Sequence, residues 1–80
     1  MEAYVLVNTQ AGKAWKVAEN LLKIKGMKKA HAVTGTFDVI AYAEFPRIDD
    51  LAGIIDKLQT IDGVVRTRTA IAMAKRPSSL

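Results

Sequence analysis

The spacing of apolar residues divides the chain into segments with two different periods. Residues 3–8 form a short apolar run rich in β-forming side chains, which predicts a first strand. From residue 13 the apolar positions recur at i, i+3, i+4 and i+7, the pattern of an amphipathic helix, and Gly26 ends it. The apolar stripe of this helix comprises Ala14, Val17, Ala18, Leu21 and Ile24. Trp15 and Leu22 widen the stripe, and we expect Trp15 to pack rather than to serve a function.

Two further strands flank a tight turn near the middle of the chain. Residues 29–34 and 39–45 are either alternately or continuously apolar, as strands are. Gly35 between them has the backbone freedom that a reversal of chain direction needs. Asp38 stands where the second of these strands should begin. A carboxylate at this position can accept hydrogen bonds from turn amides or face a ligand, and the pattern leaves both roles open.

A second helix and a last strand complete the pattern. Pro46 closes the third strand, and Asp49 and Asp50 fall in the first turn of the next helix, where negative charge suits the helix dipole. The predicted buried stripe of this helix comprises Ile48, Leu51, Ala52, Ile55 and Leu58. Gly63 ends the connection to a long final strand at residues 64–74. We expect one domain over residues 1–80, with a core at about 3–75 and a frayed tail at 76–80.

The order β-α-β-β-α-β predicts an α+β, ferredoxin-like fold. It consists of a four-stranded antiparallel sheet with two helices on one face, and right-handed crossovers place the first and third strands in the centre. The second face of the sheet then has no cover. It would expose a large apolar patch formed by Tyr4, Leu6, Ile40 and Tyr42. A homodimer that packs two sheets back to back would hide this patch, because a two-fold axis makes the patch its own partner.

Composition narrows the class of protein. Half of the 80 residues are hydrophobic, which is rich for a small chain and suggests that some of them cover a partner. The absence of cysteine excludes disulfides, thiolate metal sites and cysteine nucleophiles. Uncharged runs such as residues 30–37 are too short to span a membrane, and the first residues lack the pattern of a signal peptide. We therefore expect a cytoplasmic protein.

The net charge of +4 raises the question of nucleic acid binding. The basic residues are spread along the chain, and their one cluster straddles the predicted end of the first helix, where cations interact favourably with the helix dipole. The cluster comprises Lys23, Lys25, Lys28 and Lys29. No aromatic residue is interleaved with these lysines, which favours a solvated face over a track for phosphates.

Candidate catalytic chemistry is sparse. His31 is the only histidine, and a single histidine on a strand is more often a surface or packing residue than a base or ligand. No acidic cluster has the spacing of a metal site, and the isolated glycines form no phosphate-binding loop. RNA-binding modules of this fold need aromatic residues on the central strands, whereas the segment 35–38 places an acid in that motif. We therefore expect no enzyme, no metal and no cofactor.

Two short motifs lie on this predicted topology. Residues 33–38 read Val-Thr-Gly-Thr-Phe-Asp, and residues 63–69 read Gly-Val-Val-Arg-Thr-Arg-Thr. These motifs resemble the Thr-Gly-x-x-Asp turn and the Gly-Val-x-x-Thr-x-Thr strand of the effector-binding domain, or RAM domain, of the Lrp/AsnC regulator family. The apolar spacing of both helices also agrees, and the resemblance covers residues 3 to about 75. Full members carry a helix-turn-helix ahead of this domain, whereas this chain starts at the first strand. The resemblance therefore implies a stand-alone version, and we expect no direct DNA binding.

The resemblance also implies assembly and a ligand. Such domains dimerise through their sheets, and the dimers often form rings of about eight chains. A small effector, typically an amino acid, binds between dimers beside the turn. The ligand-binding residues that the resemblance implies are Thr34, Gly35, Thr36, Phe37, Asp38, Thr67 and Thr69, and ordinary β-propensity explains the last two equally well. Ligand-dependent assembly would regulate amino-acid metabolism or transcription.

Two other interpretations remain open at the level of sequence. In the first, the chain is a purely structural module that assembles with itself or with full-length regulators and binds no small molecule. In the second, it is an ACT-like regulatory partner of an enzyme. Stabilisation by a free amino acid would favour the effector-binding interpretation over the first of these.

Overall fold

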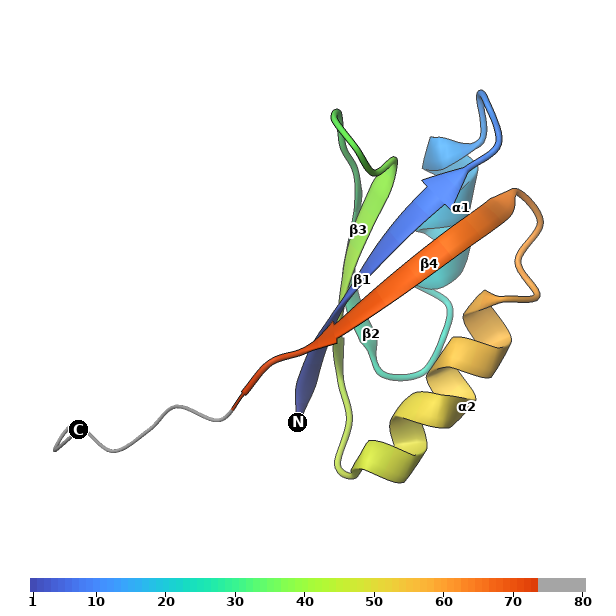
Figure 1. The fold of residues 1–80 in the computed structure, drawn as a ribbon. Helices are drawn as coiled ribbons and strands as arrows, with labels where there is room; N and C mark the ends of the chain where they lie inside the picture. The colour runs from blue at the N-terminus through green and yellow to red at the C-terminus, as the bar shows by residue number, and fades with distance from the viewer. Residues whose placement is uncertain (74–80) are drawn as a thin grey trace, which may run out of the picture.

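The structure is a computed structural model that describes residues 1–73 (Figure 1). Its elements follow the predicted order, and the four strands form one antiparallel sheet in the order β2-β3-β1-β4. The elements are β1 (Glu2–Thr9), α1 (Ala14–Leu21), β2 (Met27–Ala32), β3 (Val39–Glu44), α2 (Ile48–Leu58) and β4 (Val64–Ile71). The ferredoxin-like topology and the central position of the first and third strands are therefore confirmed.

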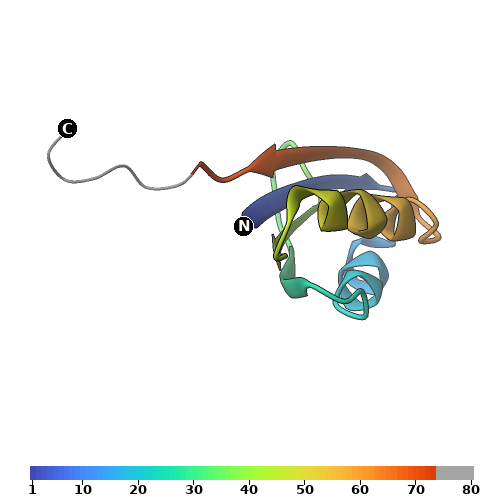
Figure 2. The same ribbon diagram turned by 90° about the horizontal axis from the view of Figure 1, so that it is seen from below.

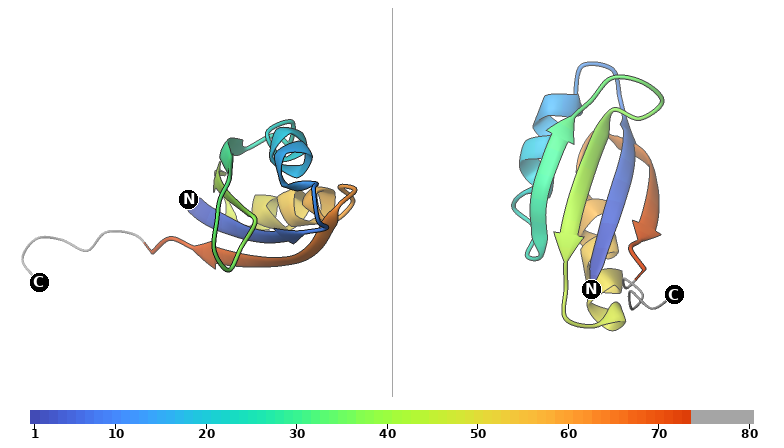
Figure 3. Two further views of the ribbon diagram at one scale, coloured as in Figure 1. Left: turned by 90° about the horizontal axis from the view of Figure 1, so that it is seen from above. Right: turned by 90° about the vertical axis from the view of Figure 1, so that its left-hand side faces the viewer.

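The core lies between the sheet and the two helices, which cover the same face (Figure 2). Alternate residues of β1 and β3 point into this layer, as the period of two in a half-covered strand requires. The buried strand residues are Ala3, Val5, Val7, Val39, Ala41 and Ala43, and the buried helix residues are Val17, Ala18, Leu21, Leu51, Ile54 and Leu58. The opposite face of the sheet is covered by no element of residues 1–73 (Figure 3).

Two strand boundaries differ from the prediction. The second strand begins at Met27 and ends at Ala32, two residues earlier at each end than predicted. The cause is an irregularity between Met27 and Lys29, which breaks the alternation that the prediction used. The final strand ends at Ile71, short of the predicted 64–74, although residue 74 and the predicted tail at 76–80 lie outside the described residues.

The predicted helix stripes need correction at both helices. In α2, Ile54 is buried, whereas Ala52 is exposed and Ile48 is 48% exposed. Helix α2 is therefore rotated about its axis relative to the prediction, so that Ile54 packs against the turn before β2. A Cβ on Gly26 in this turn would lie only 3.0 Å from Ile54 Cδ1. In α1, the prediction that Trp15 packs is wrong, since its side chain is 78% exposed. The helix packs on β2 and β3 through the rest of the predicted stripe, of which Val17, Ala18 and Leu21 are buried.

Neither helix among residues 1–73 could cross a membrane. They are 8 and 11 residues long, and a membrane span needs a longer and more continuously apolar helix.

Candidate functional site

The turn between β2 and β3 closes at the end of the sheet where β1 ends. The Asp38 N–H donates to the Val7 carbonyl, and the Val33 N–H donates to the Asp38 carbonyl, both at 2.9 Å. Gly35 near the tip has a φ of +112°, a conformation that L side chains rarely adopt. A Cβ on Gly35 would meet no atom within 4 Å. The backbone at the tip is therefore open to close approach by a ligand or another chain.

Side chains also tie this turn to the end of β1. Asp38 Oδ2 accepts the Thr9 N–H at 2.8 Å, and Asn8 Nδ2 donates to the Thr36 carbonyl at 2.9 Å. The Asp38 carboxylate thus has a structural role as the partner of a strand amide. Asn8 and Thr9 are absent from the predicted site. The signal that points to them is their place as the first polar residues after the apolar run of β1.

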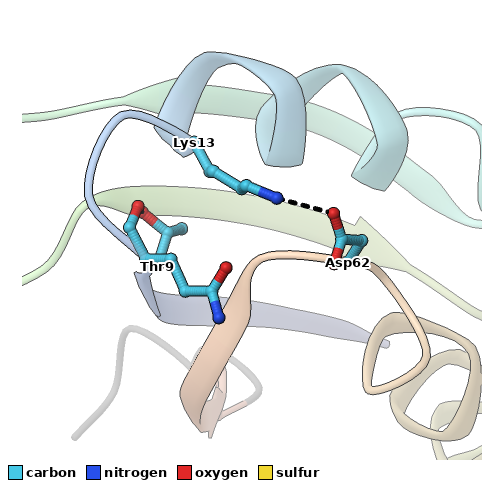
Figure 4. Close-up of polar contacts among 4 residues, drawn as sticks. Thr9, Lys13 and Asp62 are labelled. Atoms are coloured by element: carbon cyan, nitrogen blue, oxygen red, sulfur yellow. Dashed lines mark hydrogen bonds and ion pairs between the residues drawn. The ribbon is translucent and has the colours of Figure 1, made fainter.

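Two further loops meet at the same end of the molecule. Lys13 Nζ lies 2.8 Å from Asp62 Oδ2, and Figure 4 shows this ion pair near Thr9. The Gln10 N–H donates to the Gly63 carbonyl at 2.8 Å, which fixes the β1–α1 loop against the α2–β4 loop. The hydrogen bond and charge of Lys13 lower the pKa of the Asp62 carboxyl below its ordinary value. This end of the sheet is therefore held by contacts between loops distant in sequence.

The structure brings some of the predicted ligand-binding residues together and separates others. The tip residues Thr34, Gly35 and Thr36 are exposed, while Phe37 and Asp38 are half-buried. Thr67 and Thr69 lie elsewhere. They pair with Val7 and Val5 of β1, whose side chains enter the core, so both threonines lie on the helix-facing side of the sheet. Within one chain, they are on the opposite face from Tyr4 and Tyr42.

The four predicted interface residues do share the uncovered face of the sheet, which we call the open face. Tyr4 pairs with Tyr42 and Leu6 pairs with Ile40 across β1 and β3. The two tyrosine rings lie 5.3 Å apart between centroids at a tilt of 50°, a favourable aromatic geometry. Tyr4 is 47% exposed, and the other three are half-buried by their neighbours on the sheet.

Charged residues surround this apolar centre. Register places Lys29 beside Tyr42 at one edge and Arg68 beside Leu6 at the other. The Tyr42 hydroxyl donates to Glu44 Oε2 at 3.1 Å. Burial, together with hydrogen bonds and charge from Glu2 and Glu44, raises the pKa of Tyr42 above its ordinary value, so the phenol stays neutral. The open face therefore has the apolar centre and charged rim that protein interfaces have.

Three hollows of the surface lie away from the turn. The most voluminous of them, about 490 Å³, is on the open face and is lined by Tyr4, Lys28, Lys29, Tyr42 and Glu44. One of about 450 Å³ is lined by residues that include Met1, Phe45 and Pro46, where β3 ends. Another, of about 390 Å³, lies between the α1–β2 turn and α2, with Gly26 and Ile54 in its lining. None of the three contains a residue of the turn.

The chain resembles several characterised proteins. The model of the Lrp/AsnC ligand binding domain matches residues 2–79. The regulator FL11 of Pyrococcus horikoshii, described as an HTH-type transcriptional regulator, is 32% identical over 73 residues, which are 91% of this chain and 48% of FL11. The chain thus spans about half the length of the curated relatives that it matches.

Solved structures agree with this relationship. The hypothetical protein PHS023 of Pyrococcus horikoshii superposes with a TM-score of 0.83 at 33% identity, covering 92% of this chain and 90% of that one. The regulator NMB0573 of Neisseria meningitidis, solved as a complex with L-Met, gives a TM-score of 0.78 at 23% identity, covering 99% of this chain and 55% of that one, and shares the fold. The turn, the open face, the topology and the match over residues 2–79 agree: this chain belongs to the Lrp/AsnC ligand-binding domain family.

Proposed function

We propose that this chain is a non-enzymatic amino-acid sensor that assembles through its open face and binds its effector at the β2–β3 turn. Ligand-dependent assembly would then regulate transcription or amino-acid metabolism without direct contact to DNA. A regulatory role agrees with the family, whose relatives include transcriptional regulators. The chemistry of the turn is the main support for the ligand.

The turn offers the groups that a free amino acid requires. A zwitterion needs N–H donors for its carboxylate and an oxygen acceptor for its ammonium group. The open tip at Gly35 and the hydroxyls of Thr34 and Thr36 supply donors. The Asp38 carboxylate uses only Oδ2 in a hydrogen bond within residues 1–73, so Oδ1 can accept from an ammonium group. The bound L-Met in the Neisseria relative supports the choice of an amino acid.

Assembly would complete this site. The turn lies on the surface of one chain, and a closed pocket there needs a second copy to exclude water. A homodimer through Tyr4, Leu6, Ile40 and Tyr42, extended to a ring, would supply such copies. In this proposal Phe37 lines the pocket. Thr67 and Thr69, on the other side of the sheet, could contribute only from a neighbouring chain.

A second candidate is an interaction module that binds no small molecule and assembles alone or with full-length regulators. The hydrogen bond from the Thr9 N–H to Asp38 favours it, because the carboxylate already has a structural task. The two candidates predict different responses to free amino acids.

A thermal-shift screen of the twenty amino acids separates the candidates. An effector at 100 times its Kd should add about 2.7 kcal/mol to the free energy of unfolding. The matched controls are the N-acetyl and carboxamide derivatives of each hit, which lack one charge and should give no stabilisation. If no amino acid raises the melting temperature at millimolar concentration, the interaction module is the better description.

A further inference from the structure

The sole tryptophan of the chain lies on the surface. Trp15 is 78% exposed on α1, and Leu22, seven residues later, is 47% exposed. Leu22 is the C-cap residue of α1 and keeps helical φ and ψ, so it lies on about the same side as Trp15, roughly 10.5 Å further along the helix axis. Each is followed by a lysine, Lys16 and Lys23, and both lysines are exposed. The side of α1 away from the core therefore carries an apolar pair with a basic flank.

Helix α2 carries a surface with the same spacing and the opposite charge. Ile48 is 48% exposed and Ile55 is half-buried seven residues later, with the exposed Ala52 between them. Asp49 and Asp56 follow the two isoleucines, and both are exposed. Within residues 1–73, none of these lysines and aspartates has an ion-pair partner within 4.0 Å. The four charges are thus available to another molecule.

The two surfaces face opposite sides of the molecule. On α1, the side chains of Lys13 and Val17 lie against Gly63, on the side toward α2, and Trp15 lies on the other side. On α2, Gly53, Ile54 and Lys57 line the hollow shared with the α1–β2 turn, which leaves Ile48 and Ala52 on the far side. In the right-hand view of Figure 3, α1 lies behind the β2 edge of the sheet, and α2 lies nearer the β1 and β4 side.

We propose that α1 of one copy packs against α2 of a second copy in an antiparallel pair. Trp15 then lies against Ile55, and Leu22 lies against Ile48. In an antiparallel pair, the residues that follow the apolar positions share one flank of the contact, whereas in a parallel pair they fall on opposite flanks. Lys16 therefore meets Asp56, and Lys23 meets Asp49. Glu19, the acid between the two lysines, lies nearest the uncharged Ala52.

This contact joins unlike surfaces, so it does not close on itself in a dimer. Each copy that uses its α1 surface still has a free α2 surface, and association continues into a ring or a filament. The contact uses neither the open face nor the β2–β3 turn. It therefore does not depend on the proposed function, and the two can fail separately.

The fluorescence of Trp15 reports the contact directly, because no other tryptophan contributes. The full chain is diluted over the micromolar to millimolar range while emission and mass are recorded by fluorimetry and light scattering. We expect emission to shift to shorter wavelength as the mass rises, since the indole leaves water. Trp15→Glu should remove the higher mass without lowering the melting temperature much, because the side chain makes little contact in its own chain.

Charge reversal tests the pairing. The variant K16E/K23E should weaken the association by about tenfold or more, since two attractive pairs become two repulsive ones. Adding D49K/D56K in the same chain should restore it. The control K25E/K57E makes the same change in net charge at residues that line the hollow between α1 and α2 and should leave assembly unchanged.

Two results would overturn the proposal. One is a Trp15 emission that never shifts while the mass stays at or below that of a dimer at every concentration. The other is an assembly that K16E/K23E and Trp15→Glu do not affect. Repeating the titration in a Tyr42→Lys background separates this contact from association through the open face.

Discussion

Asp38 has one role in the fold, and the proposed function gives it a second role in binding a ligand. Its Oδ2 holds the Thr9 amide at the end of β1, while its second oxygen is free to accept from an ammonium group. The two roles have different chemical requirements. The strand amide needs an acceptor of any charge, whereas an ammonium group gains from a negative one.

Substitution of Asp38 should separate these roles. Asp38→Ala should cost about 0.5–1.5 kcal/mol of stability and about 1.5–3 kcal/mol or more of amino-acid affinity. Asp38→Asn keeps an acceptor for Thr9, so it should retain most of the stability and still lose the affinity. Melting curves and titration calorimetry measure the two effects. An Asp38→Asn variant that binds as tightly as wild type would make Asp38 a residue of the turn alone.

The ion pair between Lys13 and Asp62 predicts a pH dependence of stability. Lys13 lowers the folded-state pKa of Asp62, so the pair stabilises the fold above the ordinary aspartate value. That contribution is lost as the pH falls through the lowered value. The melting temperature of Asp62→Asn should be slightly below that of wild type at about pH 7 and should converge with it near pH 2. A difference in melting temperature between the variant and wild type that stays constant down to pH 2 would contradict this role of the Asp62 charge.

At the scale of elements, glycine has different roles in a turn and in a helix. The turn into β2 depends on Gly26, which has a φ of +98° and whose Cβ would lie 3.1 Å from the Glu44 carbonyl. The helix glycine Gly53 has no such constraint. The two positions therefore respond in opposite ways to the same substitution.

Gly26→Ala should destabilise the fold by more than about 1 kcal/mol, because it adds a clash to an unfavourable φ. Gly53→Ala should stabilise a dilute, unassembled chain by about 0.5–1 kcal/mol, because alanine loses less entropy in a helix. Denaturant unfolding of both variants provides the comparison. Equal effects at the two sites would refute this account of the α1–β2 turn.

At the scale of the whole molecule, the proposed dimer depends on the open face. Tyr42→Lys would place an ammonium group in the centre of the proposed sheet-to-sheet contact and should convert the dimer to monomers. Light scattering at micromolar concentration should show at least twice the chain mass of 8.7 kDa for wild type and about that mass for the variant. Ala11→Lys, which adds the same charge in the exposed β1–α1 loop, is the control. A wild-type chain that is monomeric throughout would exclude the dimer.

The distribution of charge predicts weak interaction with DNA. The basic residues of the chain are dispersed, and both helices among residues 1–73 lie on the sheet, with β2 and β3 between them in sequence. Binding to duplex DNA should therefore appear only at low salt, as the net charge of +4 alone predicts. Tight binding at physiological ionic strength with a steep dependence on salt would contradict this expectation.

The sequence by itself determined the element order, the topology and the two central strands. The reason is local: apolar residues recur with period 2 in β1 and β3 and near 3.6 in the helices, and Gly26, Gly35 and Gly63 mark the turns. The open-face set was also predictable, because alternation in a strand assigns each residue to a face. The turn was found as a motif of consecutive residues, which needs no tertiary information.

Only the tertiary structure decided how these elements meet. Register between β1 and β4 places Thr67 and Thr69 on the helix-facing side, and the hydrogen bond of Asp38 to Thr9 joins residues 29 positions apart. The rotation of α2 buries Ile54 in place of Ala52, and the position of α1 on β2 and β3 leaves Trp15 in water. Periodicity defines an apolar side of a helix to within about one residue. The neighbour that covers it is chosen by packing between segments distant in sequence.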